Sequence, residues 1–570
     1  MGYLKFKSLY DRNPIIKLDD SKHQIHEGLT EINKELRSIK QGVICFETYP
    51  GINLDILKTD IIELLNPDQL ILIEDFSKTS EEINQMLSFN LTQDRVFGKY
   101  SYHTINDFYD SETIIKLNNK IDPNKLTIVY GFGATLINHD FLIMVSLTRW
   151  EIQLRYRQGM TNFKIENKDE DVLRKYKRGY FIEWRVADRI KQEYIDKLNY
   201  LIDYTNSDHP VMINNDTYQY ILSEIVKRPF RMIPYFDPGV WGGQWMKEVC
   251  HLDPNEQNFA WSFDGVPEEN SIKIKLGKAI IELPAQDVVQ FRPIELMGSR
   301  VHARFGHHFP IRFDLLDTFE GGNLSLQVHP LTEYIQETFG MTYTQDESYY
   351  ILDSKADGSV YLGFKNNIDK EAFMNDLKDA EEGKISFDAD KYVNKYPAQK
   401  HDHFLIPAGT IHCSGRNTMI LEISACVYIF TFKLWDWDRL GLDNKPRPVH
   451  LAHGFKNLQF DRNTDFVNQQ LVNQIKKVDE QTEITGLHDR EFLETTRYKF
   501  KDTVIFDMNE SINVANLVEG TKMNIESMDD SFAPFEVHYA ETFLMPAQIN
   551  KVKLQCLDEN GCIIIKAHVR

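Results

Sequence analysis

The stretch LSLQVHP, residues 324–330, places Gln327 and His329 two positions apart in an apolar run. The leucines and the valine favour a buried strand, and Pro330, which lacks a backbone N–H, is expected to end it. Side chains at i and i+2 of a strand point to the same side, so Gln327 and His329 face one way. Such a pair is either two satisfied polar groups at a sheet edge or part of a metal site.

Two further stretches favour the metal site. Glu347 begins the strand-like run ESYYILD, and His412 lies in IPAGTIHCSG (406–415), where Pro407 to Gly409 predict a turn into a short strand. Two imidazoles, a carboxylate and an amide oxygen suit Zn²⁺ or a similar divalent ion, and Mn²⁺, Fe²⁺, Co²⁺ and Ni²⁺ accept the same ligands. Such a set leaves room for water or substrate.

Several motifs together resemble type I mannose-6-phosphate isomerase, a metal-dependent cupin family. LSLQVHP, Glu347, PAGTIH and LWDWDRLGLDNKPRPVH (434–450) follow the order of the family. VWGGQWMKE (240–248) looks like its opening, and ETFLMPA (541–547) is similar to a strand near its end. The resemblance covers roughly residues 234–570. It implies a mainly β jelly-roll barrel with Gln327, His329, Glu347 and His412 as the metal ligands.

The resemblance also implies a reaction. The family interconverts mannose 6-phosphate and fructose 6-phosphate through an enediol-type proton transfer, which needs a base, a metal and cations for the sugar phosphate. We therefore predict a metal-dependent isomerase with altered active-site charges. Two alternatives remain open: a non-catalytic metal- and sugar-binding cupin acting as a sensor or scaffold, and an isomerase of a different sugar, either phosphorylated or unphosphorylated.

The altered charges are specific. Asp314, in HFPIRFDLLDT (308–318), and Gln345 stand where the family has lysines, and the family's Asp…Arg pair aligns with Ile429 and Lys433. Lys433 keeps a charge without the guanidinium fork. Asp314 is predicted to be an alternative base, a hydrogen-bond partner of a neutral sugar hydroxyl, or a surface aspartate.

Arg439, in the DWDR motif, is the best candidate for binding an anionic group of the substrate, and its alternative role is an ion pair with Asp436 or Asp438. Lys365 and Lys445 are weaker candidates, because lysines of this kind are more often solvated loop charges. The predicted catalytic residues are therefore Arg439, Lys433 and Asp314.

The amino-terminal region alternates strand-like and helix-like segments, which predicts an α/β domain with a parallel sheet. The expected buried strands are 41–47, 69–76, 126–133 and 141–147, and apolar residues spaced three or four apart predict a helix over 184–202. The region, including CFETYPGINLDIL (45–57), is similar to the P-loop fold of nucleoside kinases. Asn53, Leu54 and Asp55 stand in place of Gly, Lys and Ser/Thr, so we predict a degenerate P-loop without ATP-dependent phosphoryl transfer.

A basic cluster follows this loop in the sequence. We predict a solvated charged face, with anion binding as the alternative, for Arg149, Arg155, Arg157, Arg174, Lys175, Lys177 and Arg178. The Pro- and Gly-rich stretch 227–245 predicts a domain boundary. The expected domains are 1–230 (P-loop-like, structural or regulatory), 234–490 (metal-binding cupin, with a helical insertion at 369–384) and 491–570 (second cupin-like β region).

Composition narrows the partners. The chain has 570 residues and a formal net charge of −20, which argues against general binding of nucleic acid or anionic membranes. No segment reaches the roughly 18 apolar residues of a membrane span. The six cysteines form no CxxC pair and are expected to be reduced thiols, so the cytoplasm is the expected location. A sugar phosphate is the expected partner.

Overall fold

The structure, a computed structural model, describes residues 3–19, 23–426, 429–441, 447–486 and 489–570. The chain forms two compact units. The larger unit comprises Met1–Pro14, Val226–Asn270 and Pro293–Arg570, and the smaller unit comprises Ile15–Ile225 and Ser271–Arg292. The chain therefore passes between the units more than once. The division into three continuous domains stays a prediction.

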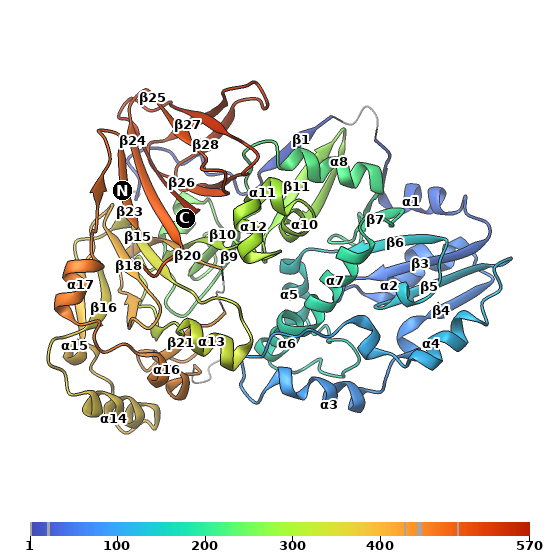
Figure 1. The fold of residues 1–570 in the computed structure, drawn as a ribbon, viewed down its shortest axis with the longest axis horizontal. Helices are drawn as coiled ribbons and strands as arrows, with labels where there is room; N and C mark the ends of the chain where they lie inside the picture. Colours follow the sequence, from blue (N-terminus) through green and yellow to red (C-terminus); the bar gives the residue numbers. More distant parts are fainter. Residues whose placement is uncertain (1–2, 20–22, 427–428, 442–446, 487–488) are drawn as a thin grey trace. The chain divides into compact units, whose positions relative to one another are not determined.

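The smaller unit is built on a sheet of strand order β2-β8-β7-β6-β3-β5-β4 (Figure 1). Its central ladders are parallel, and β8 runs antiparallel to its neighbours β7 and β2. The strands are β2 (Ile25–Glu27), β3 (Gly42–Thr48), β4 (Gln69–Leu72), β5 (Leu126–Gly131), β6 (Phe141–Ser146), β7 (Tyr200–Asp203) and β8 (Val211–Asn214). The predicted parallel strands are confirmed as β3 to β6. Their nearly continuous apolar runs suit a sheet covered on both faces.

Helices flank this sheet, and one differs from expectation. The helix predicted over 184–202 ends at Tyr194, and Tyr200–Asp203 forms strand β7 instead. Apolar spacing alone cannot distinguish a last helical turn from a short buried strand, and pairing with β6 decides for the strand. The helices of the unit are α1 (Gly28–Leu36), α2 (Leu54–Leu57), α3 (Ser80–Leu91), α4 (Ser111–Asn118), α5 (Arg149–Arg157), α6 (Val172–Arg178), α7 (Trp184–Tyr194), α8 (Asn215–Ile225) and α10 (Ala285–Phe291). A small sheet joins β1 (Ile15–Leu18), β11 (Ser271–Leu276) and β12 (Ala279–Pro284).

The larger unit contains two antiparallel sheets that carry the candidate metal ligands. The first, called the Glu347 sheet, contains β9 (Tyr235–Asp237), β10 (Trp261–Gly265), β13 (Ile311–Asp317), β15 (Glu347–Ser354), β18 (His403–Ile406) and β20 (Thr418–Ala425) in the order β18-β15-β20-β13-β10-β9. The second, called the Gln327 sheet, contains β14 (Leu326–Val328), β16 (Ser359–Phe364), β17 (Val393–Pro397), β19 (His412–Ser414) and β21 (Phe432–Trp435) in the order β17-β16-β19-β14-β21. Facing antiparallel sheets are the arrangement expected of a jelly-roll barrel.

The remaining strands form a second β-sandwich. Its sheets have the orders β22-β23-β24-β31-β26-β29 and β25-β30-β27-β28, and they enclose an apolar cluster that includes Leu517, Met523, Ile525 and Leu554. The strands are β22 (Lys476–Lys477), β23 (Thr482–Gly486), β24 (Leu493–Phe500), β25 (Thr503–Asp507), β26 (Asn513–Glu519), β27 (Lys522–Ser527), β28 (Phe535–His538), β29 (Thr542–Met545), β30 (Lys551–Cys556) and β31 (Cys562–Val569). The carboxy-terminal segment is thus β-rich, as predicted.

The helices of the larger unit are short. They are α9 (Trp245–Val249), α11 (Pro293–Met297), α12 (Ser299–Phe305), α13 (Thr332–Phe339), α14 (Lys370–Glu381), α15 (Ala389–Tyr392), α16 (Leu451–Asn457) and α17 (Thr464–Gln470). The predicted helical insertion is confirmed as α14.

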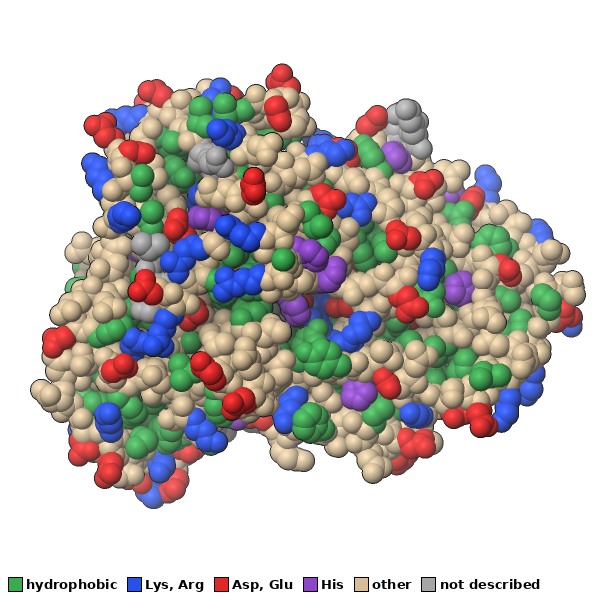
Figure 2. All heavy atoms as spheres, in the orientation of Figure 1, with side chains coloured by type: hydrophobic (Ala, Val, Ile, Leu, Met, Phe, Trp, Pro, Cys, Tyr) green, Lys and Arg blue, Asp and Glu red, His purple; other side chains and the backbone are tan. Residues whose placement is uncertain are grey.

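The surface is mixed in charge. On the face shown in Figure 2, acidic and basic side chains are interspersed over both units, so the net negative charge is spread out there. Among the described residues, no helix has the length and apolar content needed to cross a membrane.

Candidate metal centre

The short strand β14 brings three candidate residues into one row. Gln327 pairs with His412 of β19 on one side and with Lys433 of β21 on the other. Directly paired residues point to the same face of a sheet, so these three side chains face the same way. Glu347 begins β15 in the other sheet, where it pairs with Ser424 and Ile406.

The side chains converge across the two sheets. Nε2 of His329 lies 3.1 Å from Oε2 of Glu347, and Nε2 of His412 lies 2.7 Å from Oε1. The ligand atoms of this trio all lie within 4.8 Å of one another. Nε2 of Gln327 is 3.2 Å from Nε2 of His412, and a half-turn of the amide puts its oxygen in that place. The sequence-predicted ligand set is therefore brought together.

The hydrogen bonds of the two Nδ1 atoms determine which imidazole nitrogens are available to a metal ion. Nδ1 of His329 lies 3.1 Å from the Phe430 carbonyl, and Nδ1 of His412 lies 2.9 Å from the Thr410 carbonyl. A carbonyl only accepts, so each Nδ1 carries a proton, and in the neutral imidazole Nε2 is left to present a lone pair. Two such lone pairs and a carboxylate aimed at one another repel unless a cation lies between them. The donor set thus fits a divalent metal ion.

Burial makes that cation more necessary. His329 and His412 are 1% and 0% exposed, Glu347 is 2% exposed and Gln327 is 6% exposed. No donor among the described residues satisfies Nε2 of His329 or Oε1 of Glu347. Burial alone would raise the pKa of Glu347, but when the facing imidazoles are protonated their positive charge holds that pKa well below its usual range. The carboxylate is therefore held in its charged, metal-binding form.

A glycine turn fixes the distance between the two histidine-bearing segments. Gly409 has φ +86°, and its N–H donates to the His329 carbonyl at 3.0 Å. A Cβ atom at Gly409 would lie 2.6 Å from Cγ of Gln459 and 2.9 Å from the Asn457 carbonyl. Glycine is therefore required both by the backbone angle and by the space.

Sequence reasoning missed a buried charge network beside the metal ligands. Arg312 of β13 contacts Asp314 at 2.8 Å and Glu422 of β20 at 3.0 Å. Asp314 and Glu422 are paired across the two strands, and Glu422 faces Tyr349 of β15. The available signal was the alternation of charged and apolar residues in IRFDLLD and TMILEISA, which places these groups on one face.

Gln345 connects this network to the metal ligands. Its amide donates to Oε2 of Glu347 at 3.1 Å and to Oε1 of Glu422 at 3.3 Å. A neutral amide therefore stands where the family resemblance expects a lysine.

The network is short of positive charge. Burial raises the pKa of Asp314 to about 7 against the attraction of Arg312, with Glu347 adding to the rise. Burial and Asp314 together raise the pKa of Glu422 well above its usual range. Among these described residues Asp314 and Glu422 share the guanidinium of Arg312, and the Glu347 carboxylate is a third negative group close by. Either protons or a divalent cation must supply the missing charge.

The predicted catalytic residues lie in different settings. Asp314 is fully buried, so it is not a surface aspartate, and its Oδ1 has no hydrogen-bond partner among the described residues. Lys433 is half-buried and faces the same side as Gln327. Arg439 forms an ion pair with Asp436 at 2.7 Å, which was the alternative predicted for it. Arg447 contacts the other oxygen of Asp436 at 2.8 Å.

One of the two weaker lysine candidates has a partner of its own. Lys365 donates to the Asp390 carbonyl. Lys445 lies outside the described residues.

In the smaller unit, the loop after β3 is filled by the protein's own side chains. Oδ1 of Asn53 accepts from the N–H groups of Asp55 and Ile56 at the start of α2. Ile152 packs against Gly51, whose Cβ would lie 2.8 Å from it, and Arg155 donates to the Gly51 carbonyl at 3.0 Å. The Asn53 side chain thus occupies two N–H groups at the start of the helix, where a working P-loop would bind phosphate.

Four of the seven residues of the basic cluster are buried, whereas Arg155 and Arg174 are half-buried and Arg157 is exposed. Arg149, Lys175, Lys177 and Arg178 are at most 3% exposed. Arg149 contacts Asp188 at 2.6 Å, Arg178 contacts Glu183 at 2.7 Å, and Nζ of Lys175 donates to the carbonyls of Met160 and Lys168 at 3.1 and 2.6 Å. The prediction was wrong for these four residues, because tertiary folding supplied acceptors that a local charge run does not reveal.

Comparison with known proteins supports the two regions unequally. Residues 28–227 match a family described as a domain of unknown function (DUF8485). That description names no activity, so the P-loop resemblance stays a prediction.

Curated relatives carry mannose-6-phosphate isomerase names. YvyI of Bacillus subtilis (strain 168), which bears that name provisionally, is 21% identical over 352 residues, covering 60% of this chain and 100% of YvyI. ManA, the mannose-6-phosphate isomerase of the same strain, is 25% identical over 227 residues, covering 39% of this chain and 65% of ManA. The mannose-6-phosphate isomerase of Streptococcus mutans is 25% identical over 218 residues, covering 37% of this chain and 62% of that protein. The resemblance to this family is thereby confirmed over 60% of the chain.

Solved structures give weaker similarities. A mannose 6-phosphate isomerase from Bacillus subtilis has a TM-score of 0.48 at 16% identity, and a mannose 6-phosphate isomerase bound with zinc and yttrium has 0.45 at 13%. Each covers 60% of this chain and 99% of its own. Both TM-scores lie below 0.5.

Proposed function

We propose that this chain is a metal-dependent aldose–ketose isomerase that interconverts mannose 6-phosphate and fructose 6-phosphate. The observation that carries the proposal is the convergence of the Nε2 atoms of His329 and His412 on the Glu347 carboxylate, with all three side chains buried. Relatives named as mannose-6-phosphate isomerases support the substrate class. Gln327, His329, Glu347 and His412 would hold the ion, and Zn²⁺ fits their nitrogen and oxygen donors.

A divalent ion bound there would supply Lewis-acid stabilisation of negative charge on the sugar oxygens. The chain itself must move a proton between C1 and C2. Asp314 is the candidate base, because its Oδ1 is not engaged by Arg312 and its pKa is raised to about 7 by burial. A carboxyl group of that pKa can both take up and return a proton near neutral pH.

Cations would hold the anionic end of the substrate. Lys433 faces the same side as Gln327 and is the leading candidate. Arg439 is a second candidate that would have to share its guanidinium with Asp436. Both assignments would weaken the phosphate grip relative to an unshared arginine.

One observation favours a second candidate function. Arg312 is taken up by two carboxylates, and Gln345 is neutral where the family has a lysine. A site with little spare positive charge suits a neutral polyol. The alternative is therefore a protein that binds a sugar through a metal ion without turnover, or an isomerase of an unphosphorylated sugar.

The test is a direct assay on purified, metal-loaded protein. Mannose 6-phosphate or unphosphorylated mannose is supplied, and the ketose product is measured. The proposal expects fructose 6-phosphate from the first, loss of that product in His412→Ala, and full activity in His209→Ala, a control that removes an exposed histidine in the smaller unit. Turnover of mannose alone would favour the neutral-sugar isomerase. Saturable sugar binding with no product would favour the binding protein.

A further inference from the structure

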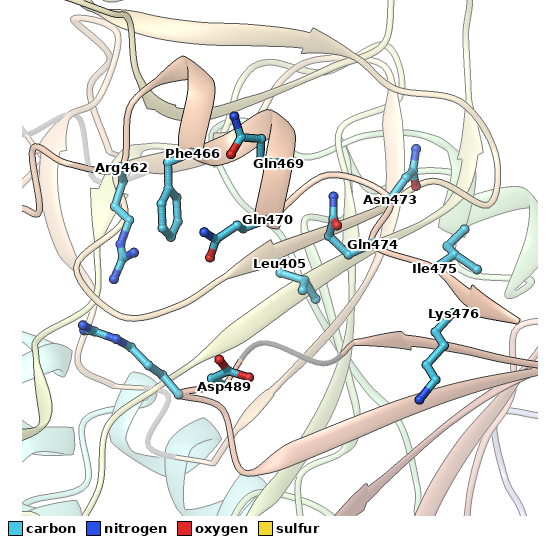
Figure 3. Close-up of a pocket in the computed structure, with 11 residues that line it drawn as sticks. Leu405, Arg462, Phe466, Gln469, Gln470, Asn473, Gln474, Ile475, Lys476 and Asp489 are labelled. Carbon is cyan, nitrogen blue, oxygen red and sulfur yellow. The ribbon is translucent and has the colours of Figure 1, made fainter. Parts of the chain in front are cut away.

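A second candidate site lies in the larger unit, outside the metal centre. A cavity of about 650 Å³ opens between α17, the segment that follows it, and residues 489–490 (Figure 3). This volume lies within the range of small-molecule sites, roughly 300–1,000 Å³. Its lining is polar and basic, with Arg462, Lys476 and Arg490 set against Asp489. A basic cavity is notable in a chain with a formal net charge of −20.

Arg462 lines one wall of the cavity. It is 4% exposed, its Nε has no hydrogen-bond partner, and no carboxylate among the described residues forms an ion pair with it. Its guanidinium lies 4.3 Å from the ring centroid of Phe466, and Figure 3 shows the two side chains together at one wall. A buried guanidinium without a counter-ion is costly, so the position favours a bound anion.

The neighbouring charge adds to that preference. Burial lowers the pKa of Arg462, and the like charge of Arg490 lowers it further against the attraction of Asp461. An anion between the two guanidinium groups would remove their repulsion. Arg462 is buried and lines an open cavity, whatever the value of its pKa.

The rim of the cavity offers hydrogen-bonding groups. Gln469 and Gln470, at the end of α17, and Gln474 line it and present amides. The side chains of Gln469, Lys476 and Asp489 are exposed. Amides and the Asp489 carboxylate around the Arg462 guanidinium suit a ligand that has several hydroxyls and one strongly anionic group.

Strand alternation separates the cavity from the metal ligands. Leu405 of β18 lines the cavity and pairs with Ser348, whereas its neighbour Ile406 pairs with Glu347. Successive residues of a strand point to opposite faces, so Leu405 faces away from the side that carries Glu347. The cavity therefore lies on the outer face of the Glu347 sheet.

We propose that this cavity is a second small-molecule site, which binds a phosphorylated sugar or a similar polyhydroxylated phosphate ester, with Arg462 holding the phosphate and the amides of the rim holding hydroxyls. The site is independent of the proposed isomerase activity.

Calorimetric titration of the full-length, metal-loaded protein with glucose 6-phosphate, inorganic phosphate and glucose tests the proposal. The variants are Arg462→Met, which keeps the volume and removes the charge, and Lys476→Gln on the exposed rim. His412→Ala disables the metal centre, and Arg416→Gln is the matched control, because it removes an exposed arginine elsewhere in the larger unit. Circular dichroism checks that each variant is folded.

The expected result is saturable binding of glucose 6-phosphate that is kept in His412→Ala and Arg416→Gln. Arg462→Met should weaken it at least about tenfold, and Lys476→Gln by a smaller factor. Inorganic phosphate bound as tightly as glucose 6-phosphate would identify free phosphate as the ligand and overturn the sugar part of the proposal. Binding lost in His412→Ala but kept in both cavity variants would place the ligand at the metal centre and refute the site. Absence of saturable binding would refute it as well, and if Arg462→Met fails to fold, Lys476→Gln decides.

Discussion

Replacing Glu347 by glutamine should leave the metal-free protein at least as stable as the wild type, but should make it less stable than the wild type once a divalent metal is added. In the metal-free protein, Glu347 is a third buried carboxylate near Arg312, and its oxygens face the Nε2 lone pairs of His329 and His412. A glutamine amide can donate to one of those nitrogens and carries no charge. Glu347→Gln should therefore be at least as stable as the wild type in a chelator. With metal present, the variant lacks the charged ligand and should be the less stable protein.

The size of the reversal follows from binding linkage. A ligand that binds only the folded state stabilises it by RT ln(1 + [L]/Kd), which is about 4.1 kcal/mol at a thousand times Kd. If loss of the carboxylate weakens binding about 100-fold, the same metal concentration gives about 1.4 kcal/mol. The free energy of unfolding should thus rise by about 2.7 kcal/mol more in the wild type than in the variant.

Thermal and urea unfolding, each with EDTA and with a Zn²⁺ series, measure this difference. Glu333→Gln is the matched control, because Glu333 is an exposed glutamate on α13. The control should respond to zinc as the wild type does. A wild type that gains no stability from any divalent ion, or a Glu347→Gln variant that gains as much as the wild type, would refute the assignment of a metal site to these residues.

Three further perturbations test the buried charges. Arg312→Met should lower the free energy of unfolding, measured by urea titration, by about 3–5 kcal/mol, because it leaves Asp314 and Glu422 buried without their cation. Adding Glu422→Gln should restore part of that loss. An unchanged urea midpoint in Arg312→Met would contradict the network. Asp264 is 1% exposed and burial raises its pKa to about 7. The unfolded chain releases this proton near pH 4 and the folded chain near 7, so wild-type stability should fall as pH rises through that window, and Asp264→Asn should remove the loss, by about 1–3 kcal/mol at pH 8. Lys175→Met should destabilise by about 2–4 kcal/mol, since buried carbonyls lose their donor, whereas a solvated lysine would change stability by less than about 0.5 kcal/mol.

The candidate ligands were accessible from sequence because each sits in a short motif of definite local structure. Gln327 and His329 share a face through strand alternation, and Pro407 to Gly409 predict the turn that precedes His412. These are local properties, and the choice of Glu347 and of all four residues as one ligand set came from the resemblance to a known metal-binding family. The convergence on Glu347 is not local, since β14 and β15 belong to different sheets.

Other features could not be predicted because they depend on distant partners. In the sequence, nothing distinguishes Arg312 from other arginines in strands. Its role depends on the pairing with β20, which places Glu422 beside Asp314. Lys175 reads as part of a charge run until the loop at 160–168 supplies carbonyl acceptors. The end of α7 at Tyr194 depends on β6, which recruits Tyr200–Asp203 as its neighbour.

The sequence by itself determined the mixed α/β character, the positions of β3 to β6, the insertion α14 and the identity of the donor atoms offered to a metal. Those follow from residue type and from periodicities of two and 3.6, which act over a few neighbours. Tertiary structure alone decided that the imidazoles turn their Nε2 atoms toward one buried carboxylate, that one guanidinium contacts two further acids, and that Arg462 is buried in the wall of an open cavity. Charge balance in a buried region is a property of everything packed there, so no segment encodes it alone.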